Sequence, residues 1–283
     1  MLKIILNRLK PRAEKIIAET QAGFRAGRRT TEQNFNLPIL CDKYVQHQQD
    51  LYQVFIVFKK SFSKVWHATL LATMKKYVQH QRNLIQVIKN LYDKANCAVL
   101  LKSSIGDWFR TTAGVRQRCL LSPNLFNIFL ERIMTDALEN HEGTVSNRGR
   151  TITNFNFPDD IDGLAGEEKE LAKLVERLDK TSTALGLEIS AEKTKLLTNN
   201  ISGINTKILV NGQKLVTVTS FKYLGSVITY ESSKPEIFSR MAQTTAALTK
   251  LEPAWNDRSV SLSFKIRLMR SFVTSILLYA CES

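Results

Sequence analysis

The spacing of apolar residues along the chain predicts a succession of helices and strands. Residues 1–20 have the pattern of a basic amphipathic helix, and residues 83–92 also place their apolar side chains at helical spacing. A loop rich in Gly and Arg, residues 21–33, leads into a further predicted helix at roughly 31–48. Residues 51–62 are instead rich in β-branched and aromatic side chains, which is typical of a strand.

Turn-forming residues divide other stretches into hairpins. Residues 97–112 are expected to form a hairpin that turns near Ser104–Gly106, and Asn211-Gly212 is a strong signal for a two-residue hairpin turn. Residues 153–166 have the pattern of a strand, a turn and a second strand. The stretch "FKYLGSVIT" is predicted to be a further strand.

Three helices are indicated from residue 122 onward. Ser122 is expected to cap a helix whose first turn contains Pro123, where the missing N–H costs nothing. Its apolar face consists of Phe126, Phe129, Leu130, Ile133 and Ala137. A second helix begins near two acidic residues and ends at Gly186, as helix electrostatics and C-capping prefer. Its buried stripe consists of Leu171, Leu174, Val175 and Leu178. From about Ser239 onward the chain is predicted to be helical.

The order of these elements favours an α+β fold over a doubly wound parallel sheet, because helices and hairpins are mixed. A chain of 283 residues suggests one elongated domain with subdomains, or two domains. Its 43% of hydrophobic residues are enough for a sizeable core.

The charge of the chain points to a polyanionic partner. Forty Lys and Arg against 26 Asp and Glu give a net charge of +14, spread along the sequence. This balance favours nucleic acid over a membrane surface, the alternative being a solvated basic surface. The four cysteines are scattered and include no C-x-x-C pair, so neither a zinc site nor a disulfide framework is expected. Without a signal peptide, another targeting signal or an 18-residue apolar run, we expect an intracellular protein of the nucleus or cytoplasm, with no membrane partner.

Two adjacent acids are the first candidate for chemistry. Asp159 and Asp160 follow Pro158 in "TNFNFPDDIDGLAG". Mg²⁺ prefers hard oxygen ligands, and a hairpin tip with two carboxylates is one way to present them. Taken alone, such a pair is more often an ordinary solvated turn, because turns favour Asp for local hydrogen bonding.

The order of several motifs changes that balance. Over nearly its whole length the chain resembles the reverse transcriptase of non-LTR (LINE-type) retrotransposons. "QAGFRAGRRTTEQ" is similar to that family's Q-x-G-F-R-x-G-R-S-T block, "VFIVFKKSFSKVWH" to motif A (F-x-D-h-x-K-A-F-D), and "GVRQRCLLSPNLFNIFLE" to motif B (G-V-x-Q-G-x-x-L-S-P). "FPDDIDGLA" is similar to motif C (F-A-D-D-x-x-h), "GLEISAEKTKLL" to motif D, and "FKYLGSVIT" to the β-hairpin motif E.

The resemblance implies a right-hand polymerase fold with fingers, an antiparallel palm and the start of a thumb. The expected division is an N-terminal fingers segment at 1–50, a palm with inserted fingers elements at 51–238, and a truncated helical thumb at 239–283. In the family, Mg²⁺ held by the motif A and motif C acids drives nucleotidyl transfer, with an RNA template, a DNA primer and a dNTP as partners. Asp159 and Asp160 match the motif C acids, as catalytic and metal-binding residues.

Three departures from the family motifs indicate a damaged site. The motif A acid is replaced by Val57, and the second motif A acid by Ser63; no Asp or Glu lies between Asp50 and Asp93 to take their place. Arg118 stands where motif B has a glycine, which would permit close backbone approach or unusual dihedral angles. Pro158 stands where motif C has a small residue, a change that a hairpin turn tolerates.

Other positions match residues that the family uses for substrate. Phe62 matches the aromatic that screens the sugar 2′ position, Gln117 is the retained motif B glutamine, and Lys193 matches a lysine near the triphosphate. Arg25 and Arg28 match basic positions of the fingers. From the sequence alone, Phe62 could equally be a core aromatic, and the lysine and arginines solvated surface charges.

Three hypotheses therefore stand. The chain is a reverse-transcriptase-like domain of a retroelement that is catalytically impaired because the motif A Asp is Val57, with weakened Mg²⁺ binding. Alternatively it is a non-catalytic basic module that binds RNA or DNA, or a degenerate relic without function. Its end inside an apolar stretch, "LLYACES", and the lack of an endonuclease region suggest a truncated copy.

Overall fold

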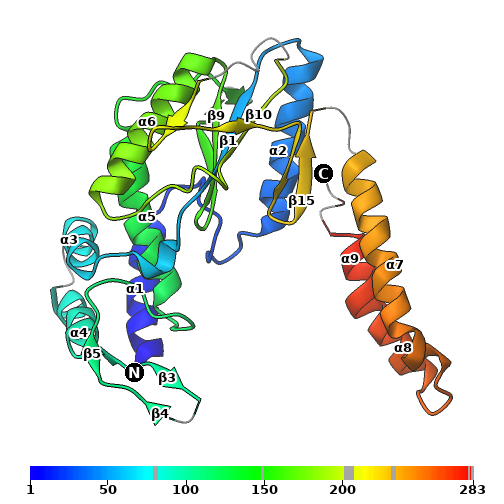
Figure 1. Ribbon diagram of the computed structural model, residues 1–283, viewed down its shortest axis with the longest axis horizontal. Helices are drawn as coiled ribbons and strands as arrows, with labels where there is room; N and C mark the ends of the chain where they lie inside the picture. The colour runs from blue at the N-terminus through cyan, green and yellow to red at the C-terminus, as the bar shows by residue number, and fades with distance from the viewer. Residues whose placement is uncertain are drawn as a thin grey trace.

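A computed structural model describes residues 1–78, 82–102, 104–147, 150–200, 207–230, 234–279 and 281. Figure 1 shows a body built around a central sheet, with a helical arm that stands apart from it and encloses an open space. Within the described residues no helix is long and apolar enough to cross a membrane.

The central sheet has five strands in the order β13-β10-β1-β9-β8. Their bounds are β1 Tyr52–Val57, β8 Asn154–Phe157, β9 Asp160–Ala165, β10 Lys195–Thr198 and β13 Val216–Thr217. β1 lies in the middle and pairs antiparallel with both β9 and β10, whereas β13 runs parallel to β10. The centre of the sheet is therefore the motif A strand, which suits the β-branched and aromatic residues found there.

Each face of the sheet packs against its own core. The helices of the body are α1 Leu2–Ile16, α2 Thr30–Gln46, α3 His67–Tyr77, α4 Arg82–Asp93, α5 Ser122–Leu138 and α6 Glu168–Ala184. Val54 and Ile56 of β1 belong to a large core that also contains the buried residues of α5 and α6. Phe55 points to the other face and joins a smaller core with Leu37 and Leu40 of α2. The alternation along β1 produces these two layers.

Five two-stranded hairpins or ribbons accompany the central sheet in the described residues. They pair β2 Asn96–Cys97 with β5 Phe109–Arg110, β3 Leu100–Leu101 with β4 Ser104–Ile105, β6 Ser146–Asn147 with β7 Arg150–Thr151, β11 Leu209–Val210 with β12 Gln213–Lys214, and β14 Ser220–Tyr223 with β15 Ser226–Thr229. The β14–β15 hairpin closes the smaller core, because Tyr223 and Ile228 are buried in it.

The arm consists of α7 Lys234–Asn256, α8 Leu262–Leu268, a π-helical turn Met269–Thr274 and α9 Ser275–Leu277. It is fastened to the turn of the β14–β15 hairpin by polar contacts. The Glu236 carboxylate accepts a hydrogen bond from the Val227 amide at 2.6 Å, and the Tyr279 hydroxyl donates to the Leu224 carbonyl at 2.7 Å. The Arg240 guanidinium donates to the Gly225 carbonyl.

Most of the predicted elements are confirmed. The N-terminal helix, the helix after the Gly- and Arg-rich loop, the helix at 83–92 and the helix that ends before Gly186 all form. Asn211 and Gly212 both have positive φ, as a two-residue hairpin turn of type I′ requires. The apolar faces predicted for α5 and α6 are buried.

Four details differ from the predictions. The hairpin in 97–112 turns between Leu101 and Ser104, earlier than predicted, because these two residues pair across it. "FKYLGSVIT" is not one strand but the hairpin that the motif E resemblance implied, since Leu224 and Gly225 both have positive φ. Helix α7 begins at Lys234, not near Ser239, because Pro235 is accommodated in its first turn. Helix α3 was not predicted.

The predicted cap of α5 is wrong as well. Ser122 is the first residue of the helix, and its side chain makes no capping bond. Its hydroxyl donates instead to the Arg116 carbonyl at 2.6 Å. Pro123 does occupy the first turn, as predicted.

Candidate functional site

Asp159 and Asp160 lie at the tip of the β8–β9 hairpin. Phe157 pairs with Asp160, so the turn itself consists of Pro158 and Asp159, and Asp160 is the first residue of β9. Pro158 therefore stands outside the ladder, where its missing N–H removes no strand hydrogen bond. The predicted strand–turn–strand geometry is confirmed, and the proline is compatible with it.

Val57 lies directly opposite Asp160 in the sheet. The two residues are register partners in the antiparallel pairing of β1 with β9. Side chains of directly opposite residues lie on the same face, with Cβ atoms roughly 4.5–5.5 Å apart. The position that the resemblance assigns to the motif A acid is therefore beside the acid pair, and an isopropyl group occupies it.

The environments of the two acids differ. The Asp159 carboxylate accepts a hydrogen bond from the Ser61 hydroxyl at 2.5 Å, from the short helical turn Ser61–Ser63 that follows β1. Burial, and secondarily the charge of Asp159, raises the pKa of Asp160 to about 6. Asp160 therefore resists ionisation more than an exposed carboxyl, as expected of a partly buried acid next to a second acid.

A third acid belongs to the same strand. Asp162 is fully buried, pairs in register with Phe55, and neither carboxylate oxygen has a hydrogen-bond partner within the described residues. Burial raises its pKa well above the usual value. Asp162 was not among the site residues predicted from the sequence. The signal was present, because Asp162 is two positions after Asp160 and a strand places residues i and i+2 on the same face.

The residues present do not fit a two-metal centre. Such a centre needs several carboxylate oxygens around two cations. Among the described residues, no group of three or more His, Cys, Asp or Glu side chains is arranged to hold a metal ion. Val57 supplies no oxygen, and one oxygen of Asp159 already accepts from Ser61.

Arg118 explains why the family has a glycine at its position. Its φ is +61°, in the left-handed region that glycine adopts freely and that other residues enter at a cost. Arg118 and the neighbouring Gln117 are both exposed, as is Lys193. These three side chains are therefore on the surface and available to a ligand.

Phe62 lies between two other aromatic rings. It stacks on Phe126 of α5 with ring centroids 4.3 Å apart, and Phe24 meets it edge-on at 6.3 Å. Phe62 is half-buried and packs against the larger core. The ring thus has a packing role, and part of it remains exposed.

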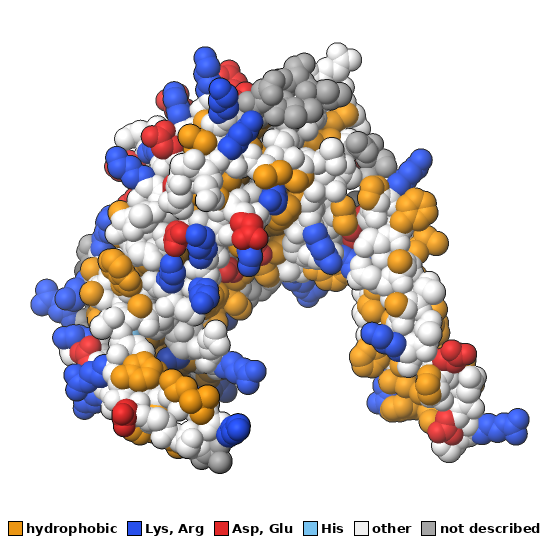
Figure 2. Space-filling model, viewed as in Figure 1, with side chains coloured by type: hydrophobic (Ala, Val, Ile, Leu, Met, Phe, Trp, Pro, Cys, Tyr) orange, Lys and Arg blue, Asp and Glu red, His pale blue; other side chains and the backbone are white. Residues whose placement is uncertain are grey.

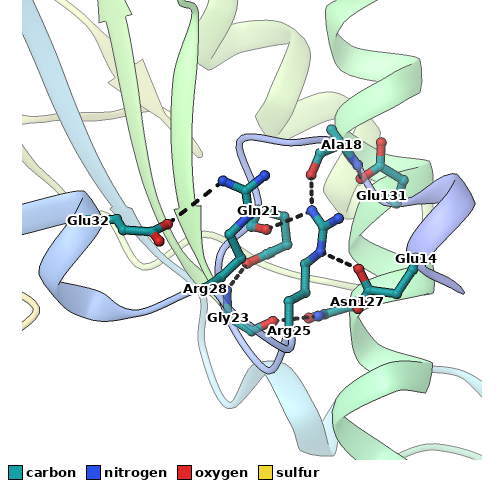
Figure 3. Close-up of polar contacts among 9 residues, drawn as sticks. All are labelled: Glu14, Ala18, Gln21, Gly23, Arg25, Arg28, Glu32, Asn127 and Glu131. Carbon is teal, nitrogen blue, oxygen red and sulfur yellow. Dashed lines mark hydrogen bonds and ion pairs between the residues drawn. The ribbon is translucent and has the colours of Figure 1, made fainter. Parts of the chain in front are cut away.

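Arg25 and Arg28, the two arginines predicted to act in the fingers, have different surroundings (Figure 3). Arg25 is inside a network: its Nε donates to Glu14 at 2.9 Å, and its Nη1 donates to the carbonyls of Ala18 at 2.6 Å and Gln21 at 3.0 Å. The side chain is only 9% exposed. Arg28 is 36% exposed and has a long ion pair with Glu32 at 3.7 Å. Arg28 is therefore free to reach a phosphate, whereas Arg25 is engaged by its own chain.

The loop that carries Arg25 also holds the aspartate turn. Gln21 is 2% exposed, and its side-chain amide donates to the Pro158 carbonyl at 3.0 Å while its carbonyl oxygen accepts from the Gly23 amide at 2.8 Å. The Gly23 carbonyl accepts from Asn127 of α5 at 2.7 Å, as Figure 3 shows. The loop thus connects α5 with the Pro158–Asp159 turn.

A sequence profile described as "Reverse transcriptase (RNA-dependent DNA polymerase)" matches residues 1–228. The chain belongs to the reverse transcriptase family.

Two curated relatives place the domain among retroelements. A transposon-derived protein of Caenorhabditis elegans is 29% identical over 140 residues, which is 48% of this chain and 50% of the relative. The Pol polyprotein of the retrotransposable element R2 of Nasonia vitripennis is 27% identical over 196 residues, which is 65% of this chain and 19% of the relative. The matches thus span half or less of these relatives' length. They support a reverse transcriptase domain of the non-LTR retrotransposon type.

Solved structures show the same fold. Telomerase from Candida tropicalis, solved with a fragment of telomeric RNA, aligns with a TM-score of 0.64 at 13% identity, covering 100% of this chain and 46% of that one. Telomerase from Candida albicans gives a TM-score of 0.55 at 13% identity, covering 99% and 48%. The prediction of an α+β right-hand polymerase fold is confirmed.

Proposed function

We propose that this reverse transcriptase domain is catalytically impaired. The observation that carries the proposal is the register of β1 and β9, in which Val57 stands opposite Asp160. Nucleotidyl transfer on two cations needs a carboxylate from each side of that position. The loss of one electrostatic group from an active site lowers the rate by about 10²–10³. Replacement of a metal ligand by an aliphatic side chain belongs at the severe end of that range.

The family uses divalent metal ions, and Asp159 and Asp160 are the residues that would contribute carboxylate oxygens to them here. With Val57 in place of the acid on the β1 side of the site, we expect Mg²⁺ to bind weakly.

Primer extension tests the proposal. The chain is incubated with an RNA template, a DNA primer, dNTPs and either Mg²⁺ or Mn²⁺, beside an Asp159→Ala variant. We expect no measurable incorporation by either protein. Robust incorporation by the parent chain that disappears in Asp159→Ala would overturn the claim of impairment.

A second candidate function is binding of nucleic acid without catalysis. The net charge of +14 favours it, and Figure 2 shows Lys and Arg side chains spread over both the body and the arm that border the open space. Counterion release makes such binding strongly dependent on salt. We expect the affinity for an RNA–DNA duplex to fall steeply between 50 and 200 mM salt. An affinity that does not change with ionic strength would contradict this function.

The subdomains and ligand contacts are part of the same proposal. Fingers at 1–50, a palm at 51–238 and a thumb from 239 would surround an RNA template and a DNA primer, with a dNTP as the third partner. Phe62, Gln117, Lys193 and Arg28 are the side chains proposed to face the substrate. Arg25 is proposed to support the fingers loop from within, because its contacts are internal. We propose an intracellular site of action, in the nucleus or the cytoplasm.

A further inference from the structure

Ser61 occupies a buried position directly beside the aspartate pair. It is the first residue of the short helical turn Ser61–Ser63, and only 4% of it is exposed. Lys60 before it has φ of +50°, so the chain turns sharply at the end of β1. The motif A pattern F-x-D-h-x-K-A-F-D has alanine where this chain has Ser61. This chain therefore has a hydroxyl within reach of Asp159 where the pattern has a methyl group.

The Ser61 hydroxyl forms a hydrogen bond with the Asp159 carboxylate. It donates to the Oδ2 atom at 2.5 Å, within the range of hydrogen bonds from a hydroxyl to an ionised carboxylate. Such charge-assisted bonds are roughly twice as strong as neutral ones. The bond places the positive hydrogen of the hydroxyl on the side of Asp159 that faces the end of β1.

On this side of Asp159, the end of β1 lies next to the start of β9. Val57 ends β1 opposite Asp160, and the turn with Ser61 follows a few residues later. A cation shared between β1 and the aspartate turn would compete with the hydroxyl for the Oδ2 atom of Asp159. It would meet the positive end of the Ser61 hydroxyl, which repels it.

We propose that Ser61 is a latch on Asp159 that competes with a divalent cation for this carboxylate. The inference rests on the proposed role of Asp159 and Asp160 as the metal pair. Ser61 is buried, so a hydroxyl displaced by a cation could not turn to water and would lose its partner. The hydroxyl thus gives Asp159 a hydrogen-bond partner in the absence of a metal ion. Ser61 would then weaken the metal site in addition to Val57.

Binding of Mn²⁺ itself tests the latch. The electron paramagnetic resonance signal of the free aquated ion is followed in the parent chain, Ser61→Ala, Val57→Asp and the double variant. Ser63→Ala is the matched control, because Ser63 lies in the same turn but is exposed. Thermal melting of each protein shows that it is folded.

In the Val57→Asp background, Ser61→Ala is expected to lower the Kd for Mn²⁺ about tenfold or more, the size of one hydrogen bond to a charged group. Ser63→Ala should leave the Kd unchanged. An unchanged Kd for Mn²⁺ in Ser61→Ala would overturn the latch. A raised Kd would also overturn it, because it would show that the Ser61 hydroxyl helps to bind the ion. If no variant binds Mn²⁺, the latch and the metal pair both fall. Salt-dependent RNA binding, measured separately, would still show whether the domain binds nucleic acid.

Discussion

The two strands that meet at the candidate site, β1 and β9, differ in their acidic residues. β9 begins with Asp160, contains the buried Asp162 and is preceded by Asp159. β1 has no acid, and Val57 stands at the position facing Asp160. Both strands nevertheless pair in full register in the centre of the same sheet.

The fold and the chemistry make separate demands at this position of β1. Valine is a good strand residue and packs on a pleated surface without needing a partner. An aspartate there would have to be paired or metal-bound to offset its partial burial. Replacing it by Val57 is therefore compatible with the fold while it removes one side of the site.

The aspartate turn and the end of β1 also differ in the polar contacts that hold them in place. The aspartate turn is supported by Gln21 and Gly23, and through their loop by Arg25. On the β1 side, the polar contact that reaches the pair is Ser61 on Asp159.

Arg25→Ala should have the largest effect on stability. Removing the guanidinium takes the side-chain donor from the Gln21 carbonyl and ends the ion pair with Glu14. The Ala18 carbonyl loses one of its two donors and keeps the Gln21 amide. We expect the free energy of unfolding to fall by about 2–3 kcal/mol, as for removal of one partner of a largely buried network. Chemical denaturation measures it.

Arg28→Ala is the control for this change. Its side chain is 36% exposed, so unfolding should change by less than about 0.5 kcal/mol. It should instead reduce the salt dependence of RNA binding by about one unit of slope. If Arg25→Ala changed the slope and not the stability, the internal role of Arg25 would be wrong.

Gly23→Ala tests the contact between the loop and the aspartate turn. A Cβ at Gly23 would lie 2.8 Å from the Cα of Pro158 and 2.9 Å from its nitrogen, so the turn must shift. We expect a loss of about 2 kcal/mol in thermal or chemical unfolding. Gly27→Ala should cost only about 1 kcal/mol, because nothing lies within 4 Å and only its φ of +76° is unfavourable. Equal losses would show that the loop does not abut the turn.

Asp160→Asn tests the buried acid on the β9 side. Because burial raises the pKa of Asp160 to about 6, the folded state binds more protons than the unfolded state between about pH 4 and pH 6. Stability is therefore lost across this window as pH rises. The variant should be more stable than the parent by about 1–2 kcal/mol at pH 7, and the difference should vanish near pH 4.

Melting curves from pH 4 to pH 8 measure this difference. Asp107→Asn is the control, since Asp107 lies in the exposed hairpin region between β4 and β5. A stability difference for Asp160→Asn that does not change with pH would contradict the raised pKa of Asp160.

Arg118→Gly should have the smallest effect, and in the stabilising direction. Glycine adopts φ of +61° without strain, so we expect a gain of about 1 kcal/mol, partly offset by the greater freedom of the unfolded chain. Arg110→Gly, in the ordinary strand β5, should destabilise instead. A loss of stability in both variants would mean that a contact of the Arg118 side chain stabilises the fold by more than the positive φ destabilises it.

The sequence was sufficient to predict the fold class and the position of the aspartate turn. Ordered motifs identify a family, and turn residues such as Asn211-Gly212 fix local geometry. It could not predict that Ser61 bonds Asp159 or that Arg25 points inward. Such contacts join residues that are distant in sequence, and one arginine looks like another until their neighbours are known. Helix α3 was missed because its apolar residues cluster and give no clear period.

Single-nucleotide incorporation on a primed RNA template is compared between the parent chain and a variant with Val57→Asp, Arg118→Gly and Pro158→Ala. If the missing carboxylate impairs the domain, incorporation should rise at least about 100-fold in the variant and vanish when Asp159→Ala is added. Equal, Asp159-dependent incorporation by the parent chain would contradict the account, because the site would then work without an acid at position 57.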